Sequence, residues 1–354
     1  MAPRPDRSAA LPVKHWTFAG LILTYRCDAC CASCYLAGGP GRQGPEMTVE
    51  SALAIWEQLA AASPHGCRVH LSGGEPFLDW PRLIGICRRA HSDGLGPLQK
   101  VETNANWATD DAVATDRLRQ LDQAGMEKLG ISADPYHQQH VPIDRPRRLA
   151  RLAEQVLGPR RVQVRWRDWL VEGCDVWRLD EPARRELLAR YAQLGRDRLN
   201  GRAGEALAND LLAAGAPGRT PEDLAGRNCR EAMLRSRHVH IDGAGLITPG
   251  TCAGIVLGQV GAGGTVGDIW RQVNDDHLHR PVVGALSQAG PAGLLDMATG
   301  AGCQPAGRYA SQCHLCWSIR RHLARRGLHV SELGPPELYN PQDTTCPPAV
   351  ACNR

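Results

Sequence analysis

The chain has 354 residues, of which 43% are hydrophobic and 22% are charged, a balance typical of a globular protein with a sizeable core. Its net charge of +4 is small and spread along the chain, which argues against a nucleic-acid partner. No apolar run reaches about 18 residues, so we expect no transmembrane helix and no membrane partner. The length predicts about two domains.

The 14 cysteines occur in a chain whose first residues lack the apolar segment of a secretion signal. That combination predicts reduced thiols, and therefore metal or cluster ligation in preference to disulfides. We expect a cytoplasmic protein.

Strand patterns alternate with helix patterns through the first two thirds of the chain, after a polar tail at 1–14. Such alternation implies right-handed crossovers and a parallel sheet, and so an α/β fold. Apolar runs predict strands at 16–24, 69–71, 98–102, 128–132 and 161–168. Helical spacing predicts helices at 48–59, 81–90, 110–123, 146–157 and 181–194.

The pattern changes in the last third. Residues 200–228 are rich in Gly, Ala and Pro and predict a linker or insertion. Residues 239–250 predict a β-hairpin that turns at 242–245. We therefore expect one domain over 15–225, a small Cys-rich domain over 226–330 and a Pro-rich tail over 331–354.

Cys27, Cys31 and Cys34 follow the first predicted strand at C-x-x-x-C-x-x-C spacing. Iron–sulfur clusters in proteins are held by cysteine thiolates, and a complete cubane normally takes four. Three thiolates on one short loop would leave one iron open to another ligand. Cys30 is an additional thiol in the same loop.

Gly73-Gly74-Glu75 follows the second predicted strand. Together with the cysteine triplet, this segment resembles the radical S-adenosylmethionine (SAM) superfamily. The resemblance implies a partial (β/α)6 TIM-like barrel, a [4Fe–4S] cluster on Cys27, Cys31 and Cys34, and SAM chelated to the fourth iron. It further implies that Gly73, Gly74 and Glu75 receive the SAM amino group.

That resemblance implies an activity. Reductive cleavage of SAM would give a 5′-deoxyadenosyl radical that abstracts a substrate hydrogen, with electrons from a donor such as flavodoxin or ferredoxin. The substrate is a peptide that is modified during its maturation or a small molecule. One departure is that Ser33 stands where the family usually has an aromatic residue, and Tyr35 follows the third cysteine. The competing hypothesis is a non-catalytic scaffold that binds zinc at its cysteines.

Polar residues at the ends of later strands are candidates for the remaining SAM contacts. By position these are Thr103, Asn104 and Ser132. Gln163, Arg165 and Arg167 alternate along the fifth predicted strand, so they would share one face. Arg165 is our candidate for the SAM carboxylate. Structural roles, as strand-end caps or solvated side chains, are the alternative.

Three residues are weaker candidates for contacting the substrate or transferring a proton, and a packing role is the alternative for each. They lie after the fourth predicted strand and are Asp134, Tyr136 and His137.

A second cysteine group occupies the last third of the chain and comprises Cys229, Cys252, Cys313 and Cys316. By chemistry alone it suits Zn²⁺ or an iron–sulfur cluster, because both take four thiolates. This part resembles the SPASM and Twitch extensions of radical SAM enzymes, which implies a second [4Fe–4S] cluster that could accept an electron. Cys303, Cys346 and Cys352 leave a further auxiliary cluster open.

Overall fold

The computed structural model describes residues 12–250 and 252–340, and the bounds below refer to this part of the chain. Its strands form one eight-stranded sheet in the order β5-β4-β3-β2-β1-β6-β7-β8. The strands are β1 Phe18–Ile22, β2 Arg68–Ser72, β3 Leu98–Thr103, β4 Lys128–Ile131, β5 Val162–Val164, β6 His238–Asp242, β7 Leu246–Pro249 and β8 Gly258–Gln259. Strands β1 to β6 pair in parallel, whereas β7 and β8 pair antiparallel.

The predicted α/β fold with a partial six-stranded parallel barrel is therefore confirmed. The sequence pattern did not indicate which segment of the chain supplies the sixth parallel strand. Strand β6 comes from the last third of the chain and pairs with β1, at the opposite end from β5. The sheet thus runs across the predicted boundary at residue 225, and the domain division stays a prediction.

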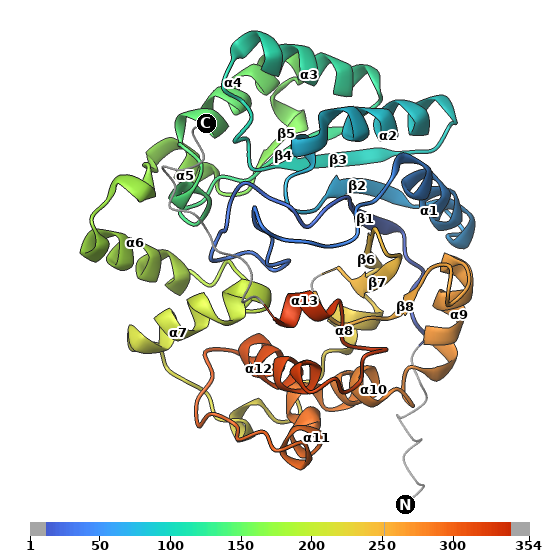
Figure 1. Cartoon of the computed structure of the whole chain (residues 1–354), viewed down its shortest axis with the longest axis vertical. Helices are drawn as coiled ribbons and strands as arrows, with labels where there is room; N and C mark the ends of the chain where they lie inside the picture. Colours follow the sequence, from blue (N-terminus) through green and yellow to red (C-terminus); the bar gives the residue numbers. More distant parts are fainter. Residues whose placement is uncertain (1–11, 251, 341–354) are drawn as a thin grey trace, which may run out of the picture.

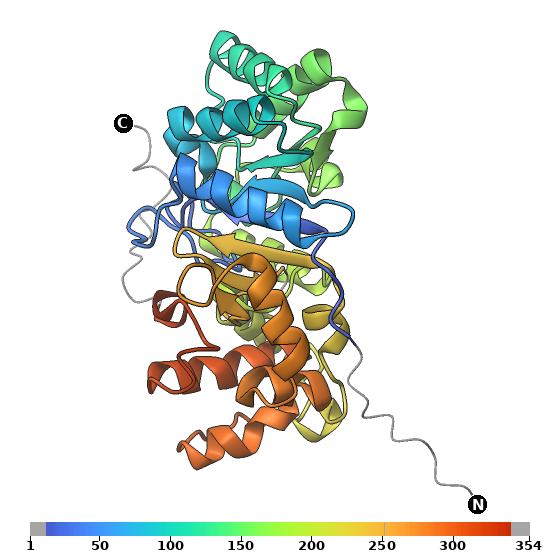
Figure 2. The same cartoon turned by 90° about the vertical axis from the view of Figure 1, so that its right-hand side faces the viewer.

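Helices α1 to α4 connect the first five strands and lie outside the sheet (Figure 1). Helices α10, α11 and α12 lie at the other end of the molecule, whereas α9 packs against α1 (Figures 1 and 2). The helices are α1 Val49–Ala62, α2 Trp80–Ser92, α3 Asp111–Gln123, α4 Asp144–Leu157, α5 Arg167–Glu172, α6 Glu181–Gln193, α7 Ala206–Ala213, α8 Arg230–Leu234, α9 Val266–Asp276, α10 Pro281–Gln288, α11 Leu295–Gly300, α12 Gln312–Arg325 and α13 Pro336–Tyr339.

The predicted strand at 161–168 is wrong in its second half. Strand β5 ends at Val164, and α5 begins at Arg167. Trp166, Trp169 and Leu170 are all buried, at a helical spacing that a strand could not bury on one side. Arg167 consequently leaves the sheet and pairs with Glu154 on α4 at 2.9 Å.

The predicted hairpin is confirmed as β6 and β7. The carboxylate of Asp242 closes its turn by accepting hydrogen bonds from the backbone N–H groups of Ala244 and Leu246, both at 3.0 Å. The hydroxyl of Tyr25 donates to the same carboxylate at 3.0 Å. Because Tyr25 begins the cysteine loop, this bond ties the loop to the hairpin.

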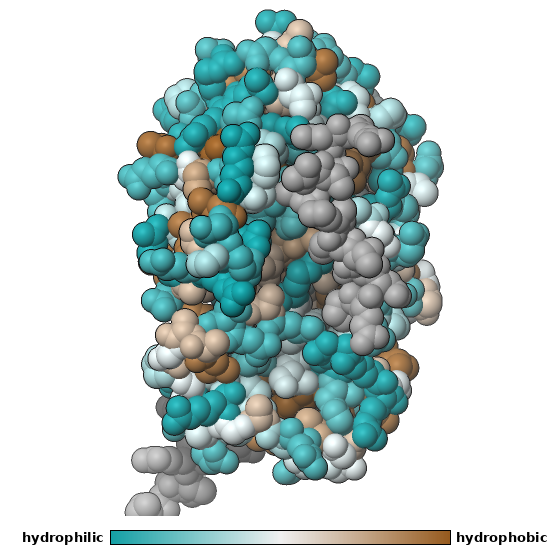
Figure 3. Space-filling model, turned by 60° about the vertical axis from the view of Figure 1, so that its left-hand side comes forward, coloured by the Kyte–Doolittle hydropathy of each residue, from teal (hydrophilic) through white to brown (hydrophobic). Residues whose placement is uncertain are grey.

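The described residues contain no helix that is both long and apolar enough to cross a membrane. On the face drawn in Figure 3, hydrophilic residues predominate and hydrophobic ones are scattered. The cytoplasmic location stays a prediction.

Strand β1 carries a glycine where two imidazoles need space. Gly20 lies opposite His70 on β2 and opposite His240 on β6. A Cβ atom at Gly20 would stand 2.2 Å from Cδ2 of His240 and 2.3 Å from Nε2 of His70. Such distances require backbone or ring displacement.

We therefore expect Gly20→Ala to lower the free energy of unfolding by about 1–3 kcal/mol, the usual range for overpacking a core. Urea unfolding followed by circular dichroism under anaerobic, reducing conditions measures it. The matched control is Gly85→Ala in α2, whose added Cβ would meet Val49 at an ordinary 3.5 Å. A helical glycine replaced by alanine gains about 0.5–1 kcal/mol. Equal stability of Gly20→Ala and wild type would contradict this packing.

Candidate functional site

The three cysteines of the first loop line one cavity of about 390 Å³. Cys27 and Cys31 are buried and Cys34 is half-buried. The backbone N–H of Ala29 lies 3.4 Å from the Cys27 sulfur, and that of Gly38 lies 3.4 Å from the Cys34 sulfur. The Ala29 N–H favours the charged form of the Cys27 sulfur, but burial, with Asp28, Cys31 and Glu75 nearby, outweighs it and raises the pKa of Cys27 well above its usual value.

Two glycines bring the end of β2 against the cysteine loop. The N–H of Gly74 donates to the carbonyl of Thr24 at 2.7 Å, and the N–H of Glu75 donates to that of Arg26 at 2.9 Å. Gly73 has a φ of 142°, and a Cβ at Gly74 would stand 2.0 Å from the Arg26 carbonyl oxygen. Both glycines line the cavity, so their predicted place beside the cysteines agrees with the geometry.

Glu75 has a different position from the one that its motif implied. Its side chain is buried and does not line the cavity. The carboxylate accepts hydrogen bonds from the backbone of Asn104 at 2.7 Å, the backbone of Phe77 at 3.0 Å and the hydroxyl of Thr103 at 3.0 Å. Burial, with Asp28 nearby, raises its pKa to about 8. Glu75 therefore joins the ends of β2 and β3.

The predicted strand-end residues Thr103, Asn104 and Ser132 all line the cavity. The side-chain amide of Asn104 lies 3.6 Å from the Cys27 sulfur and donates to Asp28 at 2.7 Å. Asn104 therefore touches the cysteine loop directly, whereas Thr103 is held by Glu75.

Arg165 also lines the cavity, where two buried acids hold it. It pairs with Asp134 at 3.3 Å and with Asp197. Burial alone would lower the pKa of Arg165, but these carboxylates outweigh it and raise the pKa. A guanidinium has five N–H donors, so two acids do not exhaust its capacity for another carboxylate.

Of the three weaker candidates, only His137 lines the cavity. Asp134 is fully buried and accepts hydrogen bonds from the backbone N–H groups of Tyr136 and His137, each at 3.0 Å. It also holds Nδ1 of His137 at 2.8 Å. Burial alone would lower the pKa of His137, but Asp134 and then Cys31 raise it well above its usual value. Asp134 thus holds His137 and Arg165 from behind the cavity wall, and His137 brings a positive charge beside Cys31.

The four cysteines of the last third line a second cavity of about 250 Å³. Cys229 precedes α8, Cys252 follows β7, and Cys313 and Cys316 lie one turn apart on α12. The buried guanidinium of Arg320 donates to the Cys316 sulfur at 3.2 Å and to the carbonyl of Ala253 at 3.0 Å. This cationic group offsets the charge of thiolates, so the donor set suits a metal cluster.

The other candidate cysteines lie elsewhere. Cys303 is half-buried and does not line the second cavity. Cys346 and Cys352 lie outside the described residues.

A third cavity of about 290 Å³ lies between the two cysteine sites. It shares Lys100, Glu102 and Arg165, among others, with the first cavity, and Arg198 and Asn200 with the second. The carboxylate of Glu102 pairs with Lys100 at 2.5 Å and accepts from Ser72 at 2.6 Å. Burial would raise the pKa of Glu102, but His70 and Lys100 lower it to about 2.

Sequence reasoning missed Lys100 and Glu102. The sequence did contain a sign of them, because two charged residues flank Val101 inside a predicted buried strand and would share one face of it. It also missed the histidines of the third cavity, His70, His238 and His240.

No known family model matches the chain, and no curated protein matches it by sequence. Solved structures with a distant likeness include BtrN in complex with AdoMet and 2-DOIA, at 15% identity and a TM-score of 0.44, covering 78% of this chain and 94% of that one. Native anSMEcpe with bound AdoMet and Cp18Cys peptide has 13% identity and a TM-score of 0.43, covering 87% and 97%. Streptococcus suis SuiB has 15% identity and a TM-score of 0.35, covering 66% and 60%. At these scores the likeness does not identify a function.

The histidines of the third cavity predict an acid-sensitive fold. Burial lowers the pKa of His70 and of His238 to about 4, although Glu102 opposes the shift in both. Imidazoles of an unfolded chain titrate near pH 6.5. Between about pH 6.5 and 4 the unfolded chain therefore binds more protons, so stability falls as the pH falls through this window.

We expect His238→Gln to lose about 2 kcal/mol less stability than wild type between pH 7 and pH 5, because its amide takes up no proton. Urea unfolding in metal-free buffer at both pH values measures the difference. His65→Gln is the matched control, because His65 is exposed and should leave the wild-type pH dependence unchanged. An identical loss in wild type and His238→Gln would contradict the argument.

Proposed function

We propose that this chain is a radical SAM enzyme with one auxiliary iron–sulfur cluster. The observation that carries the proposal is that seven residues, from four separate segments, line one cavity at the carboxyl ends of parallel strands. They are Cys27, Cys31, Cys34, Gly73, Gly74, Asn104 and Ser132. In barrels of this class the active site lies at that end of the sheet.

Each of the two proposed clusters has a set of cysteines that could bind it. Cys27, Cys31 and Cys34 would hold a [4Fe–4S] cluster, and the four cysteines beside Arg320 would hold the auxiliary one. When bound, SAM and its cluster supply a 5′-deoxyadenosyl radical for hydrogen abstraction, and the auxiliary cluster supplies an electron acceptor.

The residues around the first cavity would bind and orient SAM. Backbone groups at Gly73 and Gly74 would receive its amino group, and Arg165 would pair with its carboxylate. Asn104 and Ser132 would contact the rest of the molecule. Glu75 would act indirectly, since its carboxylate fixes Thr103 and Asn104 at the end of β3.

The third cavity is the proposed substrate site, because it opens onto the residues of both cysteine sites. Its volume of about 290 Å³ suits a small polar molecule or one side chain of a peptide. An electron donor such as flavodoxin or ferredoxin stays a prediction from family resemblance.

The first test changes the three loop cysteines. In anaerobically reconstituted protein we expect about eight irons per chain, falling to about four in a Cys27→Ala/Cys31→Ala/Cys34→Ala variant. Formation of 5′-deoxyadenosine from SAM under reduction should be lost, because no site remains for SAM. Cys174→Ala is the matched control, since Cys174 is an exposed thiol away from both sites and should behave as wild type.

Zinc in both sites of the wild type, with no 5′-deoxyadenosine, would instead establish the zinc-binding scaffold. This outcome and the expected one differ in both metal content and product.

The second test changes the auxiliary site. Cys313→Ala/Cys316→Ala should lower the iron content from about eight to about four per chain, while 5′-deoxyadenosine formation persists. Iron analysis and chromatography of the products measure the two effects. Cys303→Ala should keep about eight irons, because this thiol does not line the cavity. A loss of four irons in Cys303→Ala would show that the auxiliary ligand set is different.

A further inference from the structure

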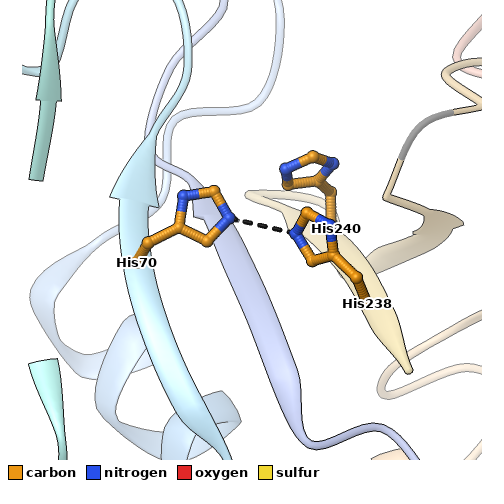
Figure 4. A group of neighbouring side chains, drawn as sticks. All are labelled: His70, His238 and His240. Carbon is orange, nitrogen blue, oxygen red and sulfur yellow. Dashed lines mark hydrogen bonds between the residues drawn. The ribbon is translucent and has the colours of Figure 1, made fainter. Parts of the chain in front are cut away.

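Three histidines from two strands converge in the third cavity, apart from both cysteine groups. His70 lies on β2, whereas His238 and His240 lie on β6, and β1 runs between these strands. One ring nitrogen from each lies within 4.8 Å of the other two. Figure 4 shows His70 reaching across β1 towards His238, with the ring of His240 beside them.

The local packing makes this convergence specific. Gly20 contributes no side chain between His70 and His240, so the two rings occupy the space above β1. The ring of Phe18 stacks on His70 at 4.8 Å and on His238 at 4.4 Å between centroids. These contacts limit the orientations of both rings and keep their nitrogens pointed at each other.

The three imidazoles do not satisfy one another. Nε2 of His70 faces Nε2 of His238 at 3.1 Å, which accounts for one donor and one acceptor. Nδ1 of His70 is buried without a hydrogen-bond partner among the described residues. The ring of His240, which is 5% exposed, packs edge-on against the rings of His70 and His238 at 5.3 Å and 4.7 Å between centroids. Buried polar nitrogens normally have partners, so the hydrogen bonding of the His70 ring is incomplete in this cluster.

We propose that His70, His238 and His240 bind a divalent transition-metal ion, for which Zn²⁺ is the best match. Zinc binds imidazole nitrogens at about 2.0–2.1 Å, and a tetrahedral ion therefore places two such nitrogens roughly 3.4 Å apart. The present separations, from 3.1 Å to at most 4.8 Å, bracket that value.

A carboxylate suited to the second shell of this ion lies nearby. A metal-bound histidine normally directs its other ring nitrogen to a carboxylate or carbonyl. With Nε2 of His70 on the metal, Nδ1 faces the carboxylate of Glu102 at 3.8 Å. Lys100 and Ser72 hold that carboxylate from its other sides.

The ion would have an open position on the side of the cavity. Three protein ligands and one exchangeable ligand are typical of catalytic zinc sites. Because all three imidazoles line the third cavity, the fourth position would take water or an oxygen or nitrogen atom of the substrate. This site selects substrates that carry a hydroxyl, amine or carboxylate group. It goes beyond the iron–sulfur sites and does not depend on them.

The test is metal analysis of full-length, anaerobically reconstituted protein whose iron count shows filled cysteine sites. After incubation with Zn²⁺ and gel filtration, we expect about one zinc per chain in wild type. His240→Asn and His70→Gln should retain less than about a tenth of that zinc with unchanged iron. His65→Asn, at an exposed position, should keep the full equivalent.

Zinc-edge X-ray absorption supplies a readout that does not depend on the variants. We expect nitrogen or oxygen neighbours only, with imidazole scattering from about three rings, at about 2.0–2.1 Å. Sulfur neighbours at about 2.3 Å would place the zinc on cysteines and overturn the proposal. Wild type without stoichiometric zinc, or histidine variants that retain it, would overturn it as well. None of these results depends on whether SAM is cleaved.

Discussion

The candidate site depends on one close contact between two backbones. The Gly73-Gly74 segment leaves β2 and lies directly on the start of the cysteine loop, through hydrogen bonds to the carbonyls of Thr24 and Arg26. No side chain fits there, because a Cβ at Gly74 would overlap the Arg26 carbonyl. The contact fixes the loop over the ends of the strands, and it makes Cys27, Cys31 and Cys34 line the same cavity as the ends of β2 and β3. The two glycines are therefore required by the close approach of the backbones, in addition to any contact with a ligand.

Buried charge around this contact is balanced locally. Asp134 and Asp197 neutralise Arg165, and Asp134 also holds His137. Lys100 neutralises Glu102 on the adjoining wall. A buried ion that loses its partner costs several kcal/mol, roughly 3–5 for a removed partner, so these pairs strongly constrain the cavity. They also leave His137, whose pKa Asp134 and then Cys31 raise, as a cationic side chain next to the sulfur of Cys31.

Local patterns predicted the alternating α/β order, the hairpin and the first cysteine group, because each of these patterns occurs within a short segment. Four cysteines as far apart as Cys229 and Cys316 were grouped by residue type, and they line one cavity. What failed needed tertiary information. The pairing of β6 with β1 joins residues more than two hundred positions apart, and no periodicity encodes it. The end of β5 was misplaced because Trp166 continues the alternation of Val162 and Val164, and its burial together with Trp169 and Leu170 is visible only in the structure. Glu75 shows a third limit, since its motif did not indicate that its carboxylate joins the ends of two strands.

The hairpin β6–β7 connects all three sites, and this follows from its position in the sheet. Its turn is bonded to Tyr25 at the start of the cysteine loop, and Cys252 follows its second strand. Its first strand carries His238 and His240 into the cavity between the two cysteine groups. A shift of β6 by one residue would turn both histidines to the opposite face of the sheet. It would also move Asp242 away from Tyr25. The register of β6 therefore sets both the distance between the cysteine sites and the side chains that line the cavity between them. The continuation of the sheet from the barrel into the Cys-rich part of the chain holds this register in place.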